Sequence, residues 1–276
     1  MADRRTVAKT AAEKGGQVAM EYFGTELAAC EKTGAVDVVT EADEAAQEVV
    51  VETIQEQFPT DTIVGEEGDA PKRVPDSGPA WIVDPIDGTT NFVHGLRRWG
   101  TAVAFVCDRT AVTSALAMPA LDEQYVVDGT DVRLNGEPIS VSDRDDPDSF
   151  VVAPFLRYTD NREAFAALLA RIIHEFDQFE RVGSAQSALA LVARGSLDAA
   201  VGLGVADPWD TVAGVQLIRR AGGTVTDLNG EPWRPDSEGI VATSGTAHQE
   251  VLDRLAGHVF PAANAQNQHN KNHDTP

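Results

Sequence analysis

Apolar positions along the chain follow two periodicities, and their order predicts the first half of the fold. From Arg4 to Cys30 and from Glu44 to Gln57 they recur at helical spacing, although Gly15-Gly16 weakens the first helix. Short apolar runs then predict strands at 62–64, 81–83, 101–106, 111–118 and 123–127. The Asn135-Gly136 pair that follows is typical of a tight hairpin. We therefore expect two helices and a large antiparallel sheet.

Beyond the acidic run Asp143 to Asp148, the pattern changes to alternating strands and helices. Strands are predicted at 150–153, 199–201, 224–227 and 240–243, and helices at 162–176, 186–194, 211–220 and 247–255. We place an α+β half with the antiparallel sheet and a metal site at 1–145, and an α/β half at 146–260. Residues 261–276 are rich in Asn, Gln and His and poor in apolar residues, which predicts a disordered tail.

The most informative segment follows the buried strand at 81–83 and reads Asp84-Pro85-Ile86-Asp87-Gly88-Thr89. Pro85 has no N–H to donate, so we expect it to end the strand and turn Asp87 back beside Asp84. Two carboxylates and the Ile86 carbonyl are hard oxygen donors, which suit Mg²⁺ or Mn²⁺ better than zinc. Gly88 and the N–H groups after it, at the start of a helix, predict a phosphate pocket. The structural alternative is a turn and a helix start capped by these side chains.

Three further acids stand where a strand ends or a helix begins, the places where α/β folds gather ligand sites. They are Asp43, Glu66 and Asp210. Taken singly, Asp43 and Asp210 are explained as helix caps, and Glu66 with Glu67 as a solvated acidic turn. With Asp84 and Asp87 they predict one carboxylate cluster.

The charge of the chain indicates the ionic strength of its surroundings and excludes some partners. Asp and Glu number 44 against 22 Lys and Arg, the net charge is −22, and lysine occurs at only five positions. This composition is typical of a high-salt cytoplasm, with an acidic mesophilic protein as the alternative. Such a surface repels nucleic acid and anionic lipid, so neither is an expected partner. Two cysteines and the lack of a signal peptide or membrane span predict a cytoplasmic protein.

These motifs resemble those of the inositol monophosphatase family, over about residues 5–255. The matching segments are Val38 to Asp43 with Lys32 before it, Gly65-Glu66-Glu67, Trp81 to His94, Gly183-Ser184-Ala185, Gly195 with Asp198, and Pro208-Trp209-Asp210 with Gly214 and Ala221-Gly222-Gly223. The resemblance implies a layered αβαβα sandwich of the sugar-phosphatase (fructose-1,6-bisphosphatase-like) type, with the site between the halves. It also implies a homodimer.

The resemblance assigns roles to the candidate residues. Glu66, Asp84 and the Ile86 carbonyl would hold a first Mg²⁺ ion. Asp84, Asp87 and Asp210 would hold a second, and Glu66 and Asp43 would lie near a weaker third; Mn²⁺ is a possible substitute. Glu66, Thr89 and Asp43 would act in catalysis, and Gly88, Thr89 and Asp210 would contact the substrate. Arg181 is open to two interpretations: it binds a second phosphate or a sugar hydroxyl, or it is a surface Arg paired with acids.

We therefore expect an enzyme that hydrolyses a small phosphate monoester with metal-activated water. Inositol 1-phosphate is the first candidate, with fructose 1,6-bisphosphate as a further substrate. In the animal inositol phosphatases, a Glu four residues after the motif Asp contacts inositol hydroxyls. Here Asp198 is followed by Ala199-Ala200-Val201-Gly202, with no acid, which weighs against strict inositol specificity. The alternatives are a dedicated fructose-1,6-bisphosphatase, a 3′-phosphoadenosine 5′-phosphate phosphatase, and a non-catalytic metal-binding relative.

Overall fold

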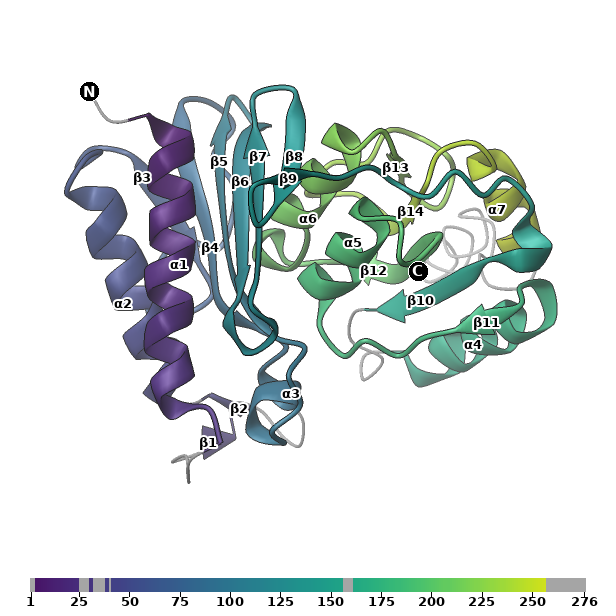
Figure 1. Ribbon diagram of the computed structural model, residues 1–276, viewed down its shortest axis with the longest axis horizontal. Coiled ribbons are helices and arrows are strands. Elements are labelled where there is room, and N and C mark those ends of the chain that lie inside the picture. The colour runs from purple at the N-terminus through teal and green to yellow at the C-terminus, as the bar shows by residue number, and fades with distance from the viewer. Residues whose placement is uncertain (1–2, 25–29, 32–37, 40, 156–160, 257–276) are drawn as a thin grey trace, which may run out of the picture.

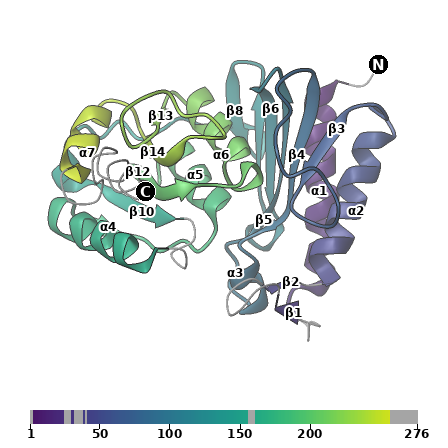
Figure 2. The same ribbon diagram turned by 180° about the vertical axis from the view of Figure 1, so that it is seen from behind.

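Helices and sheets alternate in layers across the molecule (Figure 1; Figure 2 from behind). The computed structural model describes residues 3–24, 30–31, 38–39, 41–155 and 161–256. Helices α1 (Arg4–Tyr22) and α2 (Glu41–Gln55) form the first layer and a seven-stranded sheet the second. Helices α5 (Ala185–Ala193) and α6 (Pro208–Arg220) separate this sheet from a five-stranded one, which α4 (Arg162–Glu175) and α7 (His248–Leu255) cover. The expected αβαβα order is confirmed.

The seven-stranded sheet is built from consecutive strands in chain order. Its members are β3 (Thr62–Gly65), β4 (Pro79–Asp87), β5 (Gly100–Cys107), β6 (Thr110–Met118), β7 (Glu123–Asp128), β8 (Asp131–Leu134) and β9 (Glu137–Pro138). Only β3 and β4 pair in parallel. Asn135 and Gly136 join β8 to β9 with φ angles of 50° and 89°, the left-handed conformation that a tight hairpin requires. The predicted antiparallel strands and hairpin are confirmed.

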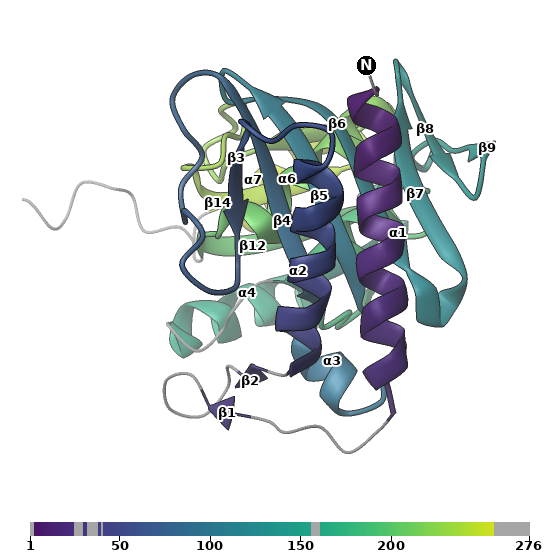
Figure 3. The ribbon, with the colours of Figure 1, turned by 90° about the vertical axis from the view of Figure 1, so that its left-hand side faces the viewer.

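Alternation along the strands of this sheet supplies two separate cores. On β4, Trp81 and Val83 join the core cluster under α1 and α2, which lie along the outer face of the sheet (Figure 3). Ala80 and Ile82 belong to the cluster on the opposite face. Because both faces are covered by helices, the strand is buried from Ala80 onward and carries a continuous apolar run.

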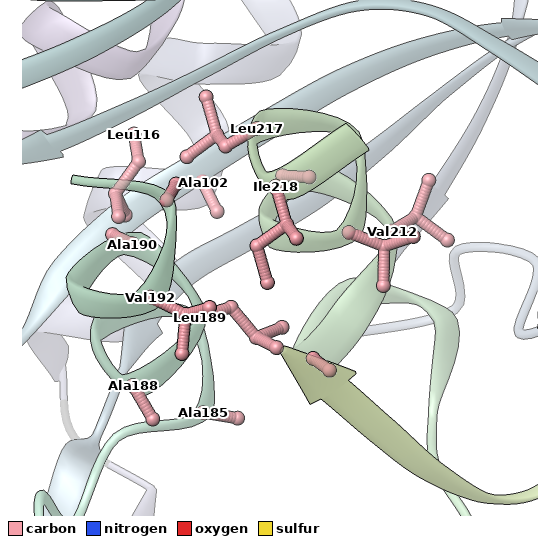
Figure 4. Packing of buried hydrophobic residues seen from close by; sticks show 14 of the residues in the cluster. Ala102, Leu116, Ala185, Ala188, Leu189, Ala190, Val192, Val212, Leu217 and Ile218 are labelled. Atoms are coloured by element: carbon pink, nitrogen blue, oxygen red, sulfur yellow. The ribbon is translucent and has the colours of Figure 1, made fainter. Parts of the chain in front are cut away.

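The middle core joins both sheets. Leu189 and Val192 of α5 pack with Leu217 and Ile218 of α6 and with Leu116 of β6 (Figure 4). The same cluster contains Ala153, Ala200 and Ala242 from the five-stranded sheet. The strands of the two sheets lie on either side of the predicted boundary at 145/146, but one core contains residues of both sheets. The division of the chain there therefore stays a prediction.

The second sheet is mixed. Its order is β11 (Gln178–Phe179), β10 (Val151–Phe155), β12 (Ala199–Val205), β14 (Glu238–Thr243) and β13 (Thr224–Thr226). Strand β10 is parallel to both neighbours, whereas β14 runs antiparallel to β12 and β13. Apolar residues of α4 and α7 pack on its outer face in a cluster of their own. The short strand β11 has no counterpart among the predicted elements.

The first helix is shorter than predicted. Helix α1 ends at Tyr22 because Phe23 is extended and Gly24 has a φ of 78°, and Cys30–Glu31 (β1) instead pairs with Val38–Val39 (β2). The helix runs through Gly15, where a Cβ atom would lie 2.6 Å from Val50 Cγ2. The glycine therefore permits close packing of α1 on α2, although it weakens the isolated helix.

Helix α2 begins earlier than predicted. It starts at Glu41, which places Asp43 in its first turn and not at its cap. Lys32 and the predicted tail lie outside the described residues, as does Thr40, which the sequence also offers as a cap for this helix. The remaining short helices are α3 (Thr89–Val93) and the 3₁₀ turns at Pro119–Leu121 and Pro147–Ser149. Among the helices of the described ranges, none has the length and apolar character needed to cross a membrane.

Candidate metal centre

Strand β4 carries two of the candidate ligands at its end. It pairs with β5 up to Asp84 opposite Ala102, and pairing resumes at Asp87 opposite Gly100 after a register shift. The prediction that Pro85 ends the strand is wrong. Its missing N–H is accommodated in this irregular segment, and its carbonyl accepts a hydrogen bond from Thr101 Oγ1 at 2.7 Å.

The first turn of α6 adds a third carboxylate to this place. Asp84, Asp87 and Asp210 each offer one oxygen, and these oxygens lie within 4.8 Å of one another. Asp84 and Asp87 are buried, and Asp210 is partly exposed. Asp210 thus lies beside two aspartates that precede it by more than 120 positions in the chain. We expected this convergence because these acids stand at strand ends and helix starts. Their roles as ligands stay a prediction.

Asp84 has the most unfavourable surroundings for a negative charge. It is 1% exposed, and within the described ranges neither of its carboxylate oxygens has a hydrogen-bond partner. Burial raises its pKa well above the ordinary value, and the charges of Glu66, Asp87, Asp210 and Asp43 raise it further. All the acids predicted to form the cluster therefore act on this one group.

These observations fit divalent cations. A buried carboxylate with no donor is costly unless a positive charge compensates it. The cluster offers only oxygen donors, which suit Mg²⁺ and Mn²⁺. The number and identity of the ions stay predictions.

Asp87 is held by a different part of the chain. Its carboxylate accepts hydrogen bonds from the backbone N–H groups of Ala185 (3.1 Å) and Gln186 (2.9 Å) and from the Ser184 hydroxyl, at the start of α5. Burial raises the pKa of Asp87 to about 6, although these hydrogen bonds favour its charged form. From the sequence, Ser184 was identifiable as a helix cap, but nothing indicated that it contacts Asp87.

The fully buried side chain of Gln186 extends this connection to α6. Its amide donates to the Trp209 carbonyl, and its Oε1 accepts from the Gly214 N–H at 2.7 Å. Helix α5 therefore contacts Asp87 and also holds the helix that carries Asp210. Gln186 was not predicted from the sequence, because an isolated Gln on an apolar helix has no recognisable signature.

The segment after Asp87 turns sharply. Gly88 has a φ of 89° and caps α3, and a Cβ atom there would lie 2.8 Å from the Cβ of Ser184. Thr89 Oγ1 donates to the Ile86 carbonyl at 3.1 Å, so the predicted catalytic hydroxyl lies beside the predicted carbonyl ligand. Gly88 is thus the residue that fits between the end of β4 and the start of α5.

Glu66 lies in the loop after β3. The side chain of Gln47 on α2 braces this loop, because its amide donates to the Glu67 carbonyl and its oxygen accepts from the Glu67 N–H, both at 2.9 Å. Glu67 is only 5% exposed. The alternative of a solvated acidic turn is therefore wrong for Glu67.

Comparison with known proteins identifies the family of the chain. The model of the inositol monophosphatase family matches residues 1–259. The chain belongs to the inositol monophosphatase family. It is accordingly a phosphatase, a hydrolase of a family that depends on metal ions.

Named relatives cover nearly the whole chain. The fructose-1,6-bisphosphatase/inositol-1-monophosphatase of Thermotoga maritima is 33% identical over 244 residues, which are 87% of this chain and 90% of that protein. Inositol monophosphatase 3 of Solanum lycopersicum is 31% identical over 256 residues, 90% of this chain and 95% of its own. The solved structure of a Thermotoga maritima IMPase superposes with a TM-score of 0.83 at 32% identity, covering 92% of this chain and 97% of that one.

One candidate residue of this family member lies just before the start of α5. Arg181 is exposed in the segment between β11 and α5. Its neighbour Glu180 forms an ion pair with Arg98. The role of Arg181 in substrate binding stays a prediction.

Proposed function

We propose that this family member is a Mg²⁺-dependent phosphomonoesterase that acts on a small polyol or sugar phosphate. Inositol 1-phosphate is the first substrate, and fructose 1,6-bisphosphate is a further one. The observation that supports the metal dependence is the buried Asp84, whose two oxygens receive no hydrogen bond from the part of the chain that the structure describes and which lies among other carboxylates.

Each candidate residue has a part in this proposal. Asp84, Asp87, Asp210, Glu66 and the Ile86 carbonyl would hold two ions, and Asp43 with Glu66 would border a weaker third. Bound divalent ions would make water more acidic and neutralise charge on the phosphate. Thr89 would orient the attacking water through its hydroxyl, and Gly88 would offer backbone to the phosphate. Phosphoryl transfer would then go directly to water.

The substrate proposal rests on relatives and on one strand. The relatives are named for both inositol 1-phosphate and fructose 1,6-bisphosphate chemistry. In this chain the residue four positions after Asp198 is Gly202, a buried position of β12 without a side chain. A site that lacks an acid there is suited to a wider range of polyols, which favours the dual activity over inositol specificity.

The test is a comparison of initial rates of phosphate release at high salt, with and without Mg²⁺. Inositol 1-phosphate, fructose 1,6-bisphosphate and 3′-phosphoadenosine 5′-phosphate would be assayed side by side. We expect Mg²⁺-dependent release from the first two. Turnover of the adenine nucleotide alone would contradict the substrate class, and turnover of fructose 1,6-bisphosphate alone would show a dedicated bisphosphatase. A folded protein that releases phosphate from none of them would favour the non-catalytic alternative.

Asp87→Asn tests the site itself. The substitution removes one charge and leaves one oxygen, where the carboxylate has two, to accept from the start of α5. We therefore expect most activity to be lost, with some loss of stability and little change in fold. Glu48→Gln on the exposed side of α2 removes the same charge and serves as the control. Activity of Asp87→Asn near that of the control would refute the assigned role.

The setting, the oligomeric state and the partners of the protein belong to the same proposal. A net charge of −22 supports activity in concentrated salt and a cytoplasmic setting of high ionic strength. Family resemblance supports a homodimer, and the acidic surface supports the absence of nucleic-acid and membrane partners. Light scattering at low and high salt measures the oligomeric state, and the salt dependence of kcat measures the salt requirement.

A further inference from the structure

Lys72 is one of only five lysines in this acidic chain, and it contacts the loop that carries Glu66. Its ammonium donates hydrogen bonds to the carbonyls of Gly65 (2.9 Å) and Glu66 (2.8 Å), and reaches that of Glu67 at 3.5 Å. The Gly65 N–H donates in turn to the Pro71 carbonyl at 3.3 Å. The segment from Gly65 to Lys72 is thus a loop closed on itself by the lysine.

The same ammonium also reaches the other half of the site. It lies 5.6 Å from the centre of the Trp209 ring, a cation–π distance, and Trp209 directly precedes Asp210. Lys72 therefore lies between the backbone that bears Glu66 and the helix turn that bears Asp210. Gln47 braces the loop from α2, so the loop is held by two different side chains.

We propose that Lys72 is a positioning residue that sets the metal affinity of the site by holding the Glu66 loop against Trp209. This inference rests on the proposed function, because it presumes that the carboxylate cluster binds metal. In the described contacts Lys72 touches no carboxylate. It acts through the backbone carbonyl of Glu66 and through Trp209, the residue before Asp210.

The sign of the effect separates positioning from simple charge. Lys72 is a cation close to a site for cations. If only Coulomb repulsion mattered, replacing Lys72 by a neutral residue would strengthen metal binding. If Lys72 positions Glu66, its removal weakens metal binding, since partners that orient metal ligands typically contribute on the order of tenfold to affinity. The two explanations predict changes in opposite directions.

The experiment is a titration of the full-length, substrate-free protein with Mn²⁺, followed by electron paramagnetic resonance of the free ion. We expect Lys72→Met to weaken Mn²⁺ binding on the order of tenfold. Lys72→Arg retains donors and the ring contact and should stay within about threefold of wild type. Lys9→Met, at an exposed position of α1, removes the same charge elsewhere and should leave binding unchanged.

Activity adds a second readout. At saturating Mg²⁺ we expect Lys72→Met to recover most of its kcat with little change in KM for the ester, because the defect lies in metal binding. Unchanged or tighter Mn²⁺ binding in a Lys72→Met protein with a normal urea midpoint would overturn the inference. Wild-type protein that binds no Mn²⁺ would instead overturn the proposed function.

Discussion

Two buried aspartates, one in each sheet region, have opposite surroundings. Asp84 on β4 is 1% exposed, and no donor among the described residues contacts its carboxylate. Asp198, just before β12, is fully buried, but its oxygens accept from Arg144 Nη1 and from the Val151 N–H, both at 2.9 Å. Burial alone therefore does not mark a functional acid; a buried charge left without partners does.

The same contrast extends to the wider regions. In the five-stranded sheet region, His248 is buried between Thr226 and Thr243, and each of its ring nitrogens lies within 2.9 Å of a hydroxyl. At the end of β4, by contrast, like charges are gathered and raise the pKa of Asp84. The ring nitrogens of His248 are satisfied within the protein, and Asp87 is likewise held by the start of α5, whereas the Asp84 carboxylate is left for a ligand. Four variants test this difference between Asp84 and the buried polar groups of the other region.

The largest expected effect is that of Asp84→Asn. Losing a central ligand should lower kcat/KM on the order of 10³-fold, equivalent to several kcal/mol of transition-state stabilisation. The free energy of unfolding of the metal-free protein at neutral pH should rise, because an uncompensated charge is removed. Phosphate release and urea unfolding in chelator measure the two effects. A less stable metal-free variant would show that Asp84 is a structural acid.

A smaller loss of activity is expected for Gly88→Ala. The added Cβ would meet the Cβ of Ser184 at 2.8 Å and displace a partner of Asp87, and misplacement of a catalytic group typically costs on the order of 100-fold in rate. Gly95→Ala is the matched control, since Gly95 also has a positive φ (71°) but a Cβ there meets nothing within 4 Å. Equal kcat values for the two variants would contradict the role of the close approach.

Asp198→Asn should affect stability and spare catalysis. An amide cannot accept both hydrogen bonds that Asp198 now accepts, so we expect the free energy of unfolding to fall by about 2 kcal/mol. At temperatures where the variant is folded, kcat should stay near that of wild type. Urea unfolding and steady-state kinetics measure these quantities. A large fall in kcat with unchanged stability would erase the distinction between the two aspartates.

The smallest effect is the contribution of His248 to acid sensitivity. Burial lowers the pKa of His248, so the unfolded chain binds its proton more tightly than the folded protein does. The free energy of unfolding should therefore fall as pH drops below the ordinary histidine value of about 6.5 and through the lowered folded value. His248→Gln should reduce the stability difference between pH 7.5 and 5.5. Because other groups titrate alike in both proteins, identical differences would exclude this contribution.

Much of the fold was predictable because its signals are local. Short apolar runs located the strands from Thr62 to Asp128, and the Asn135-Gly136 pair located a hairpin, since each depends on neighbours in the chain. The helix predicted to Cys30 was too long because apolar spacing does not register a residue such as Gly24, whose positive φ follows the helix end. Strand β11 was missed because two residues carry no periodicity.

The sequence alone determined which acids are candidates for metal binding, because motifs such as Asp84 to Thr89 place oxygen donors at the ends of strands and starts of helices. Tertiary structure alone decided how they are held. Contacts such as Ser184 to Asp87, Gln186 to Trp209 and Lys72 to the Trp209 ring join elements that meet only through packing. Ser184, for example, lies 97 positions after Asp87 in the chain. Such contacts cannot be predicted from composition or motif spacing, because the contacts form only when the layers of the sandwich pack on a common core.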